Sequence, residues 1–204
     1  MIGIIGGTCL KDVSEFKGRG EVYFRNRHGN SQPAISYGMP MPHQLPHQID
    51  YKAIINDMEN RGVEKIIAVF TVGALSDYPV GSIVIPDSFL DFTKNRDGTY
   101  GMGHSQVQLL KPDKDIGAIV GGTYVCVEGP RFSTKAESKM YKMLGGDIIG
   151  MTMVPECVLA AEKGIPYLPI CLVTDTNENV TYDEIKRVMA LNEEKIKSVI
   201  RQLL

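Results

Sequence analysis

The sequence has no excess of positive charge, and this absence narrows the range of partners. Its 22 lysine and arginine residues are outnumbered by 24 aspartate and glutamate residues, for a net charge of −2. Nucleic-acid-binding domains carry a basic face, and many membrane-associated proteins carry a polybasic segment. We therefore expect neither nucleic acid nor a membrane as a partner.

Long apolar runs and paired cysteines are also missing. The longest uncharged apolar runs, "IIAVFTVGALS" and "GAIVGGTYVCV", are far shorter than the roughly 20 residues that span a bilayer. The start, "MIGIIGG", lacks the charged segment and long apolar core of a signal peptide. The four cysteines (Cys9, Cys126, Cys157 and Cys171) include no CxxC pair and are typical of reduced, packed thiols. These features predict a cytoplasmic protein.

Several catalytic motifs are absent as well. The sequence contains no HExxH, no GxSxG, no Walker A loop and no GxGxxG. His43 and His47 are one helical turn apart, but Pro42 and Pro46 disfavour a helix there, so they do not form a helical metal pair. We expect no metal site and no bound cofactor.

What the sequence does contain is a regular alternation of strands and helices. Short β-branched runs predict buried strands over 2–5, 65–70, 82–85, 122–127, 147–150 and 166–173. Apolar residues at helical spacing, with typical end residues, predict helices over 50–62, 133–146, 154–165 and 181–204. This alternation predicts an α/β fold, a mixed β-sheet flanked by helices. Because no linker or repeat interrupts the 204 residues, residues 1–204 are expected to form a single domain.

Polar or glycine-rich segments follow the predicted strands. They are "GGTCL", "TVGAL", "EGPRFST", "GMTMVPE" and "VTDTNEN". Ligands of open α/β sheets bind where strands end and loops or helices begin. We therefore predict that these five segments line one pocket.

Each segment alone has a structural interpretation beside a functional one. Gly6, Gly7 and Thr8 could hold an anion such as phosphate on backbone N–H groups and a hydroxyl, or could form a tight turn. Thr71 could supply a hydroxyl and its segment an anion-binding nest, or the small residues could mark a crossing at the sheet.

The later segments are equally ambiguous when taken singly. Met151 and Thr152 could contact a sugar and an anion, or could be a core methionine and a helix N-cap. Asp175 and Asn177 are alternate residues at the end of a strand, so both could face one edge of a ligand. They could also form an Asx-turn.

Together the segments are far more specific, because they resemble a known family. In order, "GIIGGT", "TVGAL", "VGSIVIPDSFLDFTKNR", "YVCVEGPRFSTKAES", "LGGDIIGMTMVPECVLAAEKGIPY" and "LVTDTN" resemble the trimeric purine nucleoside phosphorylases, most closely the methylthioadenosine phosphorylase branch. The resemblance covers most of the chain. It implies a nucleoside phosphorylase-like fold and phosphorolysis, in which inorganic phosphate attacks C1′ of the ribose while the bond to the purine breaks.

The resemblance also implies roles for single residues. Thr8, Thr71 and Thr152 match phosphate positions, and Met151 matches a sugar position. Phosphate beneath the sugar would stabilise the positive charge that develops at C1′.

On the purine side, the resemblance places Phe132 against the base and Ser133 within hydrogen-bonding distance of it, while Arg131 braces the loop. Asp175 matches the group that serves N7 of the leaving purine, a role that a carboxyl group fulfils at neutral pH only if desolvation raises its pKa. Ser133 and Asp175 favour a 6-aminopurine, whereas the amide of Asn177 suits either a 6-amino or a 6-oxo group.

The resemblance extends to the 5′ end of the nucleoside and to assembly. "MPMPHQLP" resembles the segment beside the 5′ substituent, where Met39 or Met41 could give an apolar lining. His104 resembles a histidine that reaches the 5′ pocket of a neighbouring subunit. The implied assembly is a homotrimer or a dimer of trimers, with a nucleoside and inorganic phosphate as small-molecule substrates.

The chain departs from the family at its phosphate-binding Arg-His-Gly motif. Arg27 and His28 in "RNRHGN" provide these residues, but they lie too far before Tyr51, and the family spacing leads to Tyr37 instead. The two are therefore either relocated phosphate ligands or a chance match at a hairpin turn. The segment "LLKPDKDIGAIVGG" is also short, which predicts that a helix before the "EGPRF" strand is missing.

The favoured function is phosphorolysis of 5′-methylthioadenosine. Three alternatives follow from the same residues. They are phosphorolysis of a 6-oxopurine nucleoside, non-catalytic binding of a purine nucleoside with a defective phosphate site, and hydrolysis with water in place of phosphate.

Overall fold

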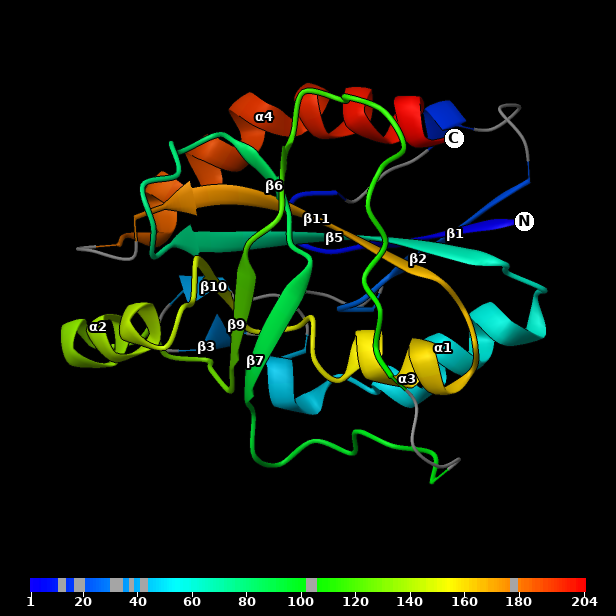
Figure 1. Ribbon diagram of the computed structural model, residues 1–204, viewed down its shortest axis with the longest axis horizontal. Coiled ribbons are helices and arrows are strands. Elements are labelled where there is room, and N and C mark those ends of the chain that lie inside the picture. The colour runs from blue at the N-terminus through cyan, green and yellow to red at the C-terminus, as the bar shows by residue number, and fades with distance from the viewer. Residues whose placement is uncertain are drawn as a thin grey trace.

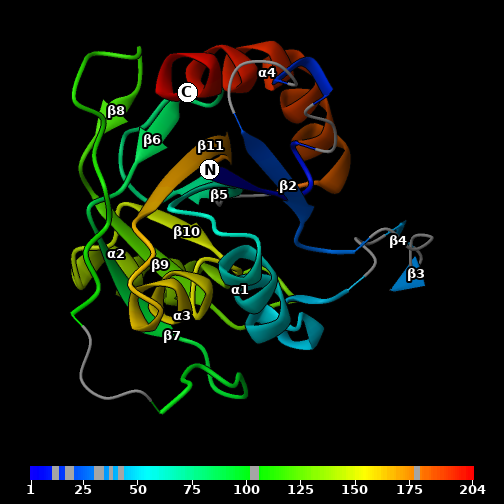
Figure 2. The same cartoon turned by 90° about the vertical axis from the view of Figure 1, so that its right-hand side faces the viewer.

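A mixed β-sheet lies at the centre of the computed structural model, which describes residues 1–10, 14–16, 21–29, 35–36, 39–40, 44–101, 106–176 and 180–204. Helix α4 (Tyr182–Leu203) crosses one face of the sheet, and α1 (Tyr51–Asn60) and α3 (Glu156–Glu162) lie against the other (Figure 1; Figure 2). Helix α2 (Lys135–Met143) packs through Tyr141 in an apolar cluster with β9 and β10 residues. The predicted α/β architecture is confirmed.

The sheet has a branched strand order. Its strands are β1 (Ile2–Gly6), β2 (Val22–Asn26), β5 (Lys65–Ala74), β6 (Ile83–Ile85), β7 (Ser88–Phe92), β8 (Ile119–Val120), β9 (Thr123–Val127), β10 (Ile148–Gly150) and β11 (Tyr167–Asp175). They follow the order β7-β9-β10-β5-β11-β6-β8, and β1 pairs with both β5 and β2. Only the pairs β10–β5 and β11–β6 are antiparallel within this sheet. A separate hairpin consists of β3 (Ile35–Ser36) and β4 (Met39–Pro40).

The central strands bury both of their faces, as their continuous apolar sequences predict. In β5, Ala68 and Phe70 belong to the apolar cluster shared with α1 and α3. Ile67 and Val69 belong to the cluster that contains α4 residues. Because successive side chains of a strand point to opposite faces, one strand supports both helical layers.

Strand β5 has a gap in the pairing along one of its two edges, and the site lies at this gap. Strand β11 pairs with β5 along one edge from Ile66 to Gly73, so β1 and β10 share the other edge. There β1 pairs with residues up to Ala68, and β10 pairs with Gly73 and Ala74. No described strand pairs with residues 69–72 on this edge. Because β1 is parallel to β5 and β10 is antiparallel, the carboxyl ends of β1 and β10 point toward each other across the gap.

Local sequence signals determine where the helices begin. Thr134 caps α2: its side chain accepts from the backbone N–H of Glu137, and the Glu137 side chain accepts from the Thr134 backbone in return. Thr181 caps α4 through the N–H of Glu184. Such caps satisfy backbone donors that lack partners in the first turn of a helix.

Every predicted strand and helix is present, with two corrections to their extent and number. Strand β5 continues to Ala74 and includes "TVGAL" up to that residue, so of the two alternatives for this segment the anion-binding nest is wrong. Strands β2, β7 and β8 and the hairpin strands β3 and β4 were not predicted, because they are very short or mix polar with apolar residues. As predicted, "LLKPDKDIGAIVGG" contains no helix. No helix within the described ranges is long and apolar enough to cross a membrane.

Candidate active site

A cavity of about 750 Å³ lies at the open edge of β5. Its walls come from the carboxyl ends of β1, β9, β10 and β11, from the middle of β5, and from the start of α4. The predicted site residues that line it are Thr8, Arg27, His28, Thr71, Phe132, Ser133, Met151, Thr152 and Asp175. The prediction that five segments meet in one pocket is therefore confirmed for every segment.

Some predicted residues lie outside the described residues. They are Asn177, His104, Met41, His43 and Tyr37. Met39 belongs to β4, but its side chain is likewise not described.

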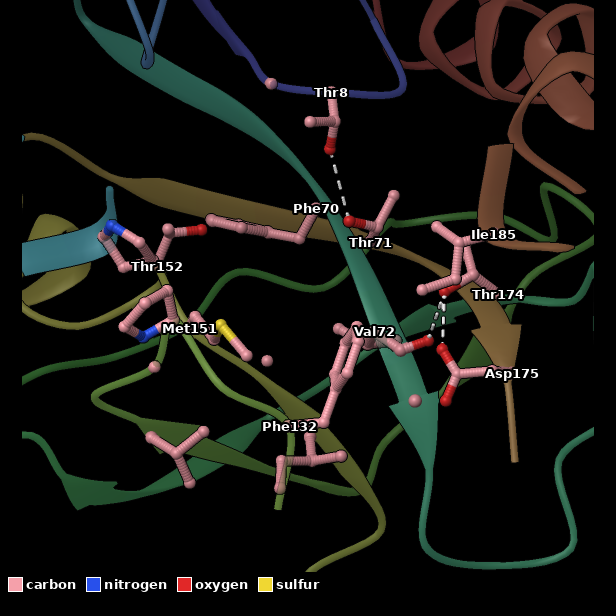
Figure 3. Close-up of a pocket in the computed structure, with 18 of the residues that line it drawn as sticks. Thr8, Phe70, Thr71, Val72, Phe132, Met151, Thr152, Thr174, Asp175 and Ile185 are labelled. Carbon is pink, nitrogen blue, oxygen red and sulfur yellow. Dashed lines mark hydrogen bonds between the residues drawn. The ribbon is translucent and has the colours of Figure 1, made fainter. Parts of the chain in front are cut away.

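Three threonines provide the hydroxyl groups of the cavity. The Oγ1 atoms of Thr8 and Thr71 lie 3.3 Å apart, and Thr152 lies across Phe70 from them (Figure 3). Thr152 is not a helix cap, because α3 begins after Pro155, which makes no side-chain cap. The threonines are partly exposed to the cavity, so their hydroxyls can donate to a bound anion.

Arg27 reaches the same region from the end of β2, and its guanidinium is almost fully buried. Nη1 donates to the backbone oxygen of Val69 at 3.0 Å, within the open edge of β5. The guanidinium carbon also lies 4.2 Å from the centre of the Phe70 ring. A Cβ atom at Gly7 would lie 2.9 Å from Nη1, which explains the glycine at that position.

His28 follows Arg27 and also lines the cavity. Its Nδ1 lies 3.1 Å from the backbone oxygen of Gln44, and its backbone N–H donates to Asn26 Oδ1 at 2.9 Å. Neither residue lies at a hairpin turn, because β2 pairs with β1 in parallel, and both line the cavity.

The loop that carries Phe132 and Ser133 is braced by a contact with α2. Phe132 is 44% exposed, so its ring is free to receive a planar ligand. Arg131 donates from both terminal nitrogens to Glu137, at 2.8 and 2.7 Å. Gly129 has a φ of 65°, and a Cβ atom there would lie 2.5 Å from the sulfur of Met151. The loop therefore packs directly on the methionine that faces the cavity (Figure 3).

Asp175 stands at the end of β11, beyond an irregularity in the strand. The register against β5 shifts between Val173 and Asp175, which interrupts the alternation of side chains. The Thr174 hydroxyl lies 2.9 Å from Oδ2 of Asp175 and 3.2 Å from the Val72 carbonyl oxygen (Figure 3). The carboxylate is thus held at the cavity, on the side of Phe132.

Two further sets of residues were missed by the sequence analysis. The first is an apolar wall on α4, formed by Tyr182, Ile185 and Met189. Their helical spacing predicts an amphipathic helix but does not show that its apolar face lines a cavity. The second is Arg96, the last residue of the segment "VGSIVIPDSFLDFTKNR", to which no role was assigned from the sequence.

Arg96 joins the two loops on which the predicted sugar and purine residues lie. Its Nη1 donates to the carbonyl oxygens of Met151 at 2.7 Å and Val154 at 2.6 Å, and Nη2 donates to that of Glu128 at 2.9 Å. Its side chain is 2% exposed and lies 3.3 Å from the Glu128 carboxylate. One buried cation therefore fixes the spacing between both loops.

Metal ligands do not gather at this cavity. Within the part of the chain that the structure describes, no group of three or more His, Cys, Asp or Glu side chains could hold a metal ion. The threonine hydroxyls and Arg27 are instead donors suited to an oxyanion.

The family follows from comparison with known proteins. Residues 4–204 match the family model described as the phosphorylase superfamily. The chain belongs to the phosphorylase superfamily. Within this superfamily it is 39% identical to the S-methyl-5′-thioadenosine phosphorylase of Pyrococcus abyssi, over 98% of this chain and 90% of that protein. It is 35% identical to the enzyme of that name from Nitrosopumilus maritimus, over 100% and 90% of the two chains.

Solved structures of the superfamily agree in fold. A methylthioadenosine phosphorylase from an antarctic soil metagenomic library is 30% identical, with a TM-score of 0.80, and the match covers 98% of this chain and 84% of that one. The Schistosoma mansoni methylthioadenosine phosphorylase in complex with adenine is 23% identical, with a TM-score of 0.78, and covers 98% and 89%. The predicted resemblance and the predicted nucleoside phosphorylase-like fold are confirmed.

Proposed function

We propose that this chain is a pentosyltransferase that cleaves 5′-methylthioadenosine with inorganic phosphate. The products are adenine and 5-methylthioribose 1-phosphate. The observation that carries the proposal is the meeting of Thr8, Thr71, Thr152 and Asp175 around one cavity. The names of the two relatives from Pyrococcus abyssi and Nitrosopumilus maritimus also support the proposal, because both are called S-methyl-5′-thioadenosine phosphorylase.

The phosphate subsite lies at the open edge of β5. Thr8, Thr71 and Thr152 donate hydroxyl hydrogen bonds to the phosphate oxygens, and Arg27 and His28 complete the wall. Phosphate held there is positioned for attack, so the entropic cost of bringing the reactants together is met on binding. Its charge also stabilises the cationic C1′ centre as the bond to the base lengthens.

The base and the leaving group lie on the opposite side of the cavity. The Phe132 ring stacks on the purine, Ser133 binds its edge, and Met151 contacts the ribose. A phosphate oxygen forms its bond to C1′ while the C1′–N9 bond breaks and leaves its electron pair on the purine. Asp175 donates a proton or a hydrogen bond to N7 and so neutralises this charge.

The 5′ substituent is placed at the start of α4. Tyr182, Ile185 and Met189 form an apolar wall there, which suits a methylthio group better than a hydroxyl. Ser133 and Asp175 favour a 6-aminopurine over a 6-oxopurine. Adenine is therefore the proposed base.

The proposed assembly is a homotrimer or a dimer of trimers. Support comes from α2, where Met140, Met143 and Leu144 at its end expose apolar side chains close in sequence to Phe132. Exposed apolar patches are typical of interfaces between subunits. We also propose a cytoplasmic location, supported by four free, buried cysteines. Burial raises the pKa of Cys9 and of Cys126 to about 12.

The test is purine release from methylthioadenosine, adenosine and inosine, each with and without inorganic phosphate. The proposal predicts phosphate-dependent adenine release, fastest from methylthioadenosine, with the sugar 1-phosphate as second product. Release without phosphate would instead show hydrolysis. Faster cleavage of inosine would show a 6-oxopurine enzyme, and nucleoside binding without any release would show a binding protein.

A further inference from the structure

Glu156 is a fully buried carboxylate for which the proposed mechanism has no role. It stands on the first turn of α3 and belongs to "GMTMVPE", the segment that also carries Met151 and Thr152. It accepts hydrogen bonds from Arg27 Nε at 2.6 Å, from Arg27 Nη2 at 2.8 Å and from the Tyr167 hydroxyl at 2.6 Å. Since a buried carboxylate is costly unless its oxygens are bonded, these contacts bind Glu156 firmly to Arg27.

The contacts of Arg27 leave one donor for a ligand. A guanidinium carries five N–H groups. Nε and one N–H of Nη2 are bound to Glu156, while Nη1 donates to Val69 O at 3.0 Å and to Gly6 O at 3.4 Å. The remaining N–H belongs to Nη2 and has no partner among the described residues. Arg27 lines the cavity together with Gly7 and Thr8.

The charge of Arg27 is secured by the same carboxylate. Burial by itself would lower the pKa of Arg27, but the negative charge of Glu156 more than offsets this, so the pKa lies above its ordinary value. Arg27 is therefore cationic whenever the protein is folded. The bidentate contact also fixes the plane of the guanidinium, since both partners are planar.

We propose that Glu156 is a positioning residue for the phosphate subsite: it orients Arg27 so that the remaining Nη2 N–H donates to a phosphate oxygen. The inference rests on the proposed function and extends it. Glu156 does not itself touch phosphate. It acts on the anion only through the guanidinium that it holds.

The substitution Glu156→Gln tests the orientation of Arg27 while keeping the size of the side chain at position 156. The amide is nearly the same shape, but its NH₂ group would face an Arg27 donor, so the two-bond contact is lost. We expect the KM for phosphate to rise about tenfold or more, in line with the strength of charge-assisted hydrogen bonds, while the KM for methylthioadenosine changes less than about twofold. Glu156→Asp keeps the charge and should fall between the wild type and Glu156→Gln.

Two other variants control for lost stability. Cys157→Ala removes an equally buried side chain from the same helix without touching Arg27, so it should leave both KM values unchanged. Tyr167→Phe removes only the hydroxyl that supports Glu156. It should raise the KM for phosphate by a smaller factor in the same direction, and it provides the test if Glu156→Gln does not fold.

Isothermal titration with inorganic phosphate makes the inference independent of turnover. Weaker phosphate binding by Glu156→Gln than by wild type supports it, even if the wild type releases no purine and the proposed function fails. Equal or tighter binding by the variant would overturn it, since Glu156 would then only cancel charge or support the fold. Absence of phosphate binding by the wild-type protein would overturn it as well.

Discussion

Asp175 reaches the cavity only because β11 ends irregularly. Val173 is buried in the core, and the shift of register after it releases the next residues from strict alternation. The Thr174 hydroxyl then holds the carboxylate through Oδ2. At this scale, the proposed proton donor depends on one bulge and one neighbouring hydroxyl.

The substitution Asp175→Ala should abolish most turnover without unfolding the protein. Loss of a positioned acid typically lowers kcat by about 10²–10⁴-fold, and the side chain is only partly buried. Steady-state adenine release measures this. Asp183→Ala, at an exposed position on α4, is the matched control and should retain kcat. Full activity of Asp175→Ala would contradict the assigned role.

Phe132 is proposed to act on the base alone. Stacking of a base on an aromatic ring contributes about 1–3 kcal/mol, so Phe132→Ala should raise the KM for methylthioadenosine about tenfold or more. The KM for phosphate should stay within about twofold and serves as the internal control. A rise in the phosphate KM alone would place the ring on the wrong side of the cavity.

At the scale of elements, the site depends on how strands end around β5. The carboxyl ends of β1 and β10 face each other across residues 69–72, and β2 adds Arg27 beside them. Arg96 then ties the β9 and β10 loops together through their carbonyl oxygens. The directions of the strands thus bring the loops together, and the buried Arg96 then holds the loops after β9 and β10 in place.

This arrangement explains which parts of the site could be predicted. Thr8, Thr152 and Asp175 follow strands with strong β-branched runs, so both the strands and their polar ends are visible in the sequence. Arg27 follows β2, whose partly exposed residues give no such run. Its place depends on parallel pairing with β1, a contact between distant segments that spacing along the chain cannot show. The same holds for Arg96, whose acceptors are all far from it in sequence.

The start of α2 provides a test by pH. The pKa of Glu137 is lowered to about 2, by hydrogen bonds from Arg131 first and then from Thr134. A carboxyl whose pKa is depressed on folding adds stability above its unfolded pKa, and this stability is lost as the pH falls through the folded value.

We therefore expect Glu137→Gln to reduce the free energy of unfolding by about 1 kcal/mol at pH 7, a value discounted for solvent screening. The difference from wild type should shrink as the pH falls from about 4.5 toward 2, as urea unfolding at several pH values would show. A difference that does not depend on pH would mean that the ionised contact contributes nothing.

At the scale of the whole molecule, the helical layers cover both faces of the sheet but leave apolar side chains exposed around α2. Met143 is 78% exposed and Leu144 is 56% exposed. Met143 is the last residue of α2 and Leu144 is its C-cap, and α2 follows the loop that carries Phe132. An interface there would connect assembly with the loop that carries Phe132.

Sedimentation equilibrium tests this proposal. The wild-type protein should have about three times the chain mass of 22.5 kDa if it is a trimer, and about six times that chain mass if it is a dimer of trimers. Met143→Glu should shift the mass toward that of one chain, because a charge would be buried in the interface. Leu191→Glu, at an exposed apolar position on α4, is the control and should leave the mass of the assembly unchanged. A monomeric wild type would contradict the proposed assembly.

The most direct measurement of the central claim is a crystal structure with sulfate and 5′-methylthioadenosine bound. We predict sulfate oxygens within about 3 Å of the hydroxyls of Thr8, Thr71 and Thr152, with the ribose above them. The purine should stack on Phe132 with N7 facing Asp175. A sulfate bound elsewhere, or a purine whose N7 points away from Asp175, would contradict the account.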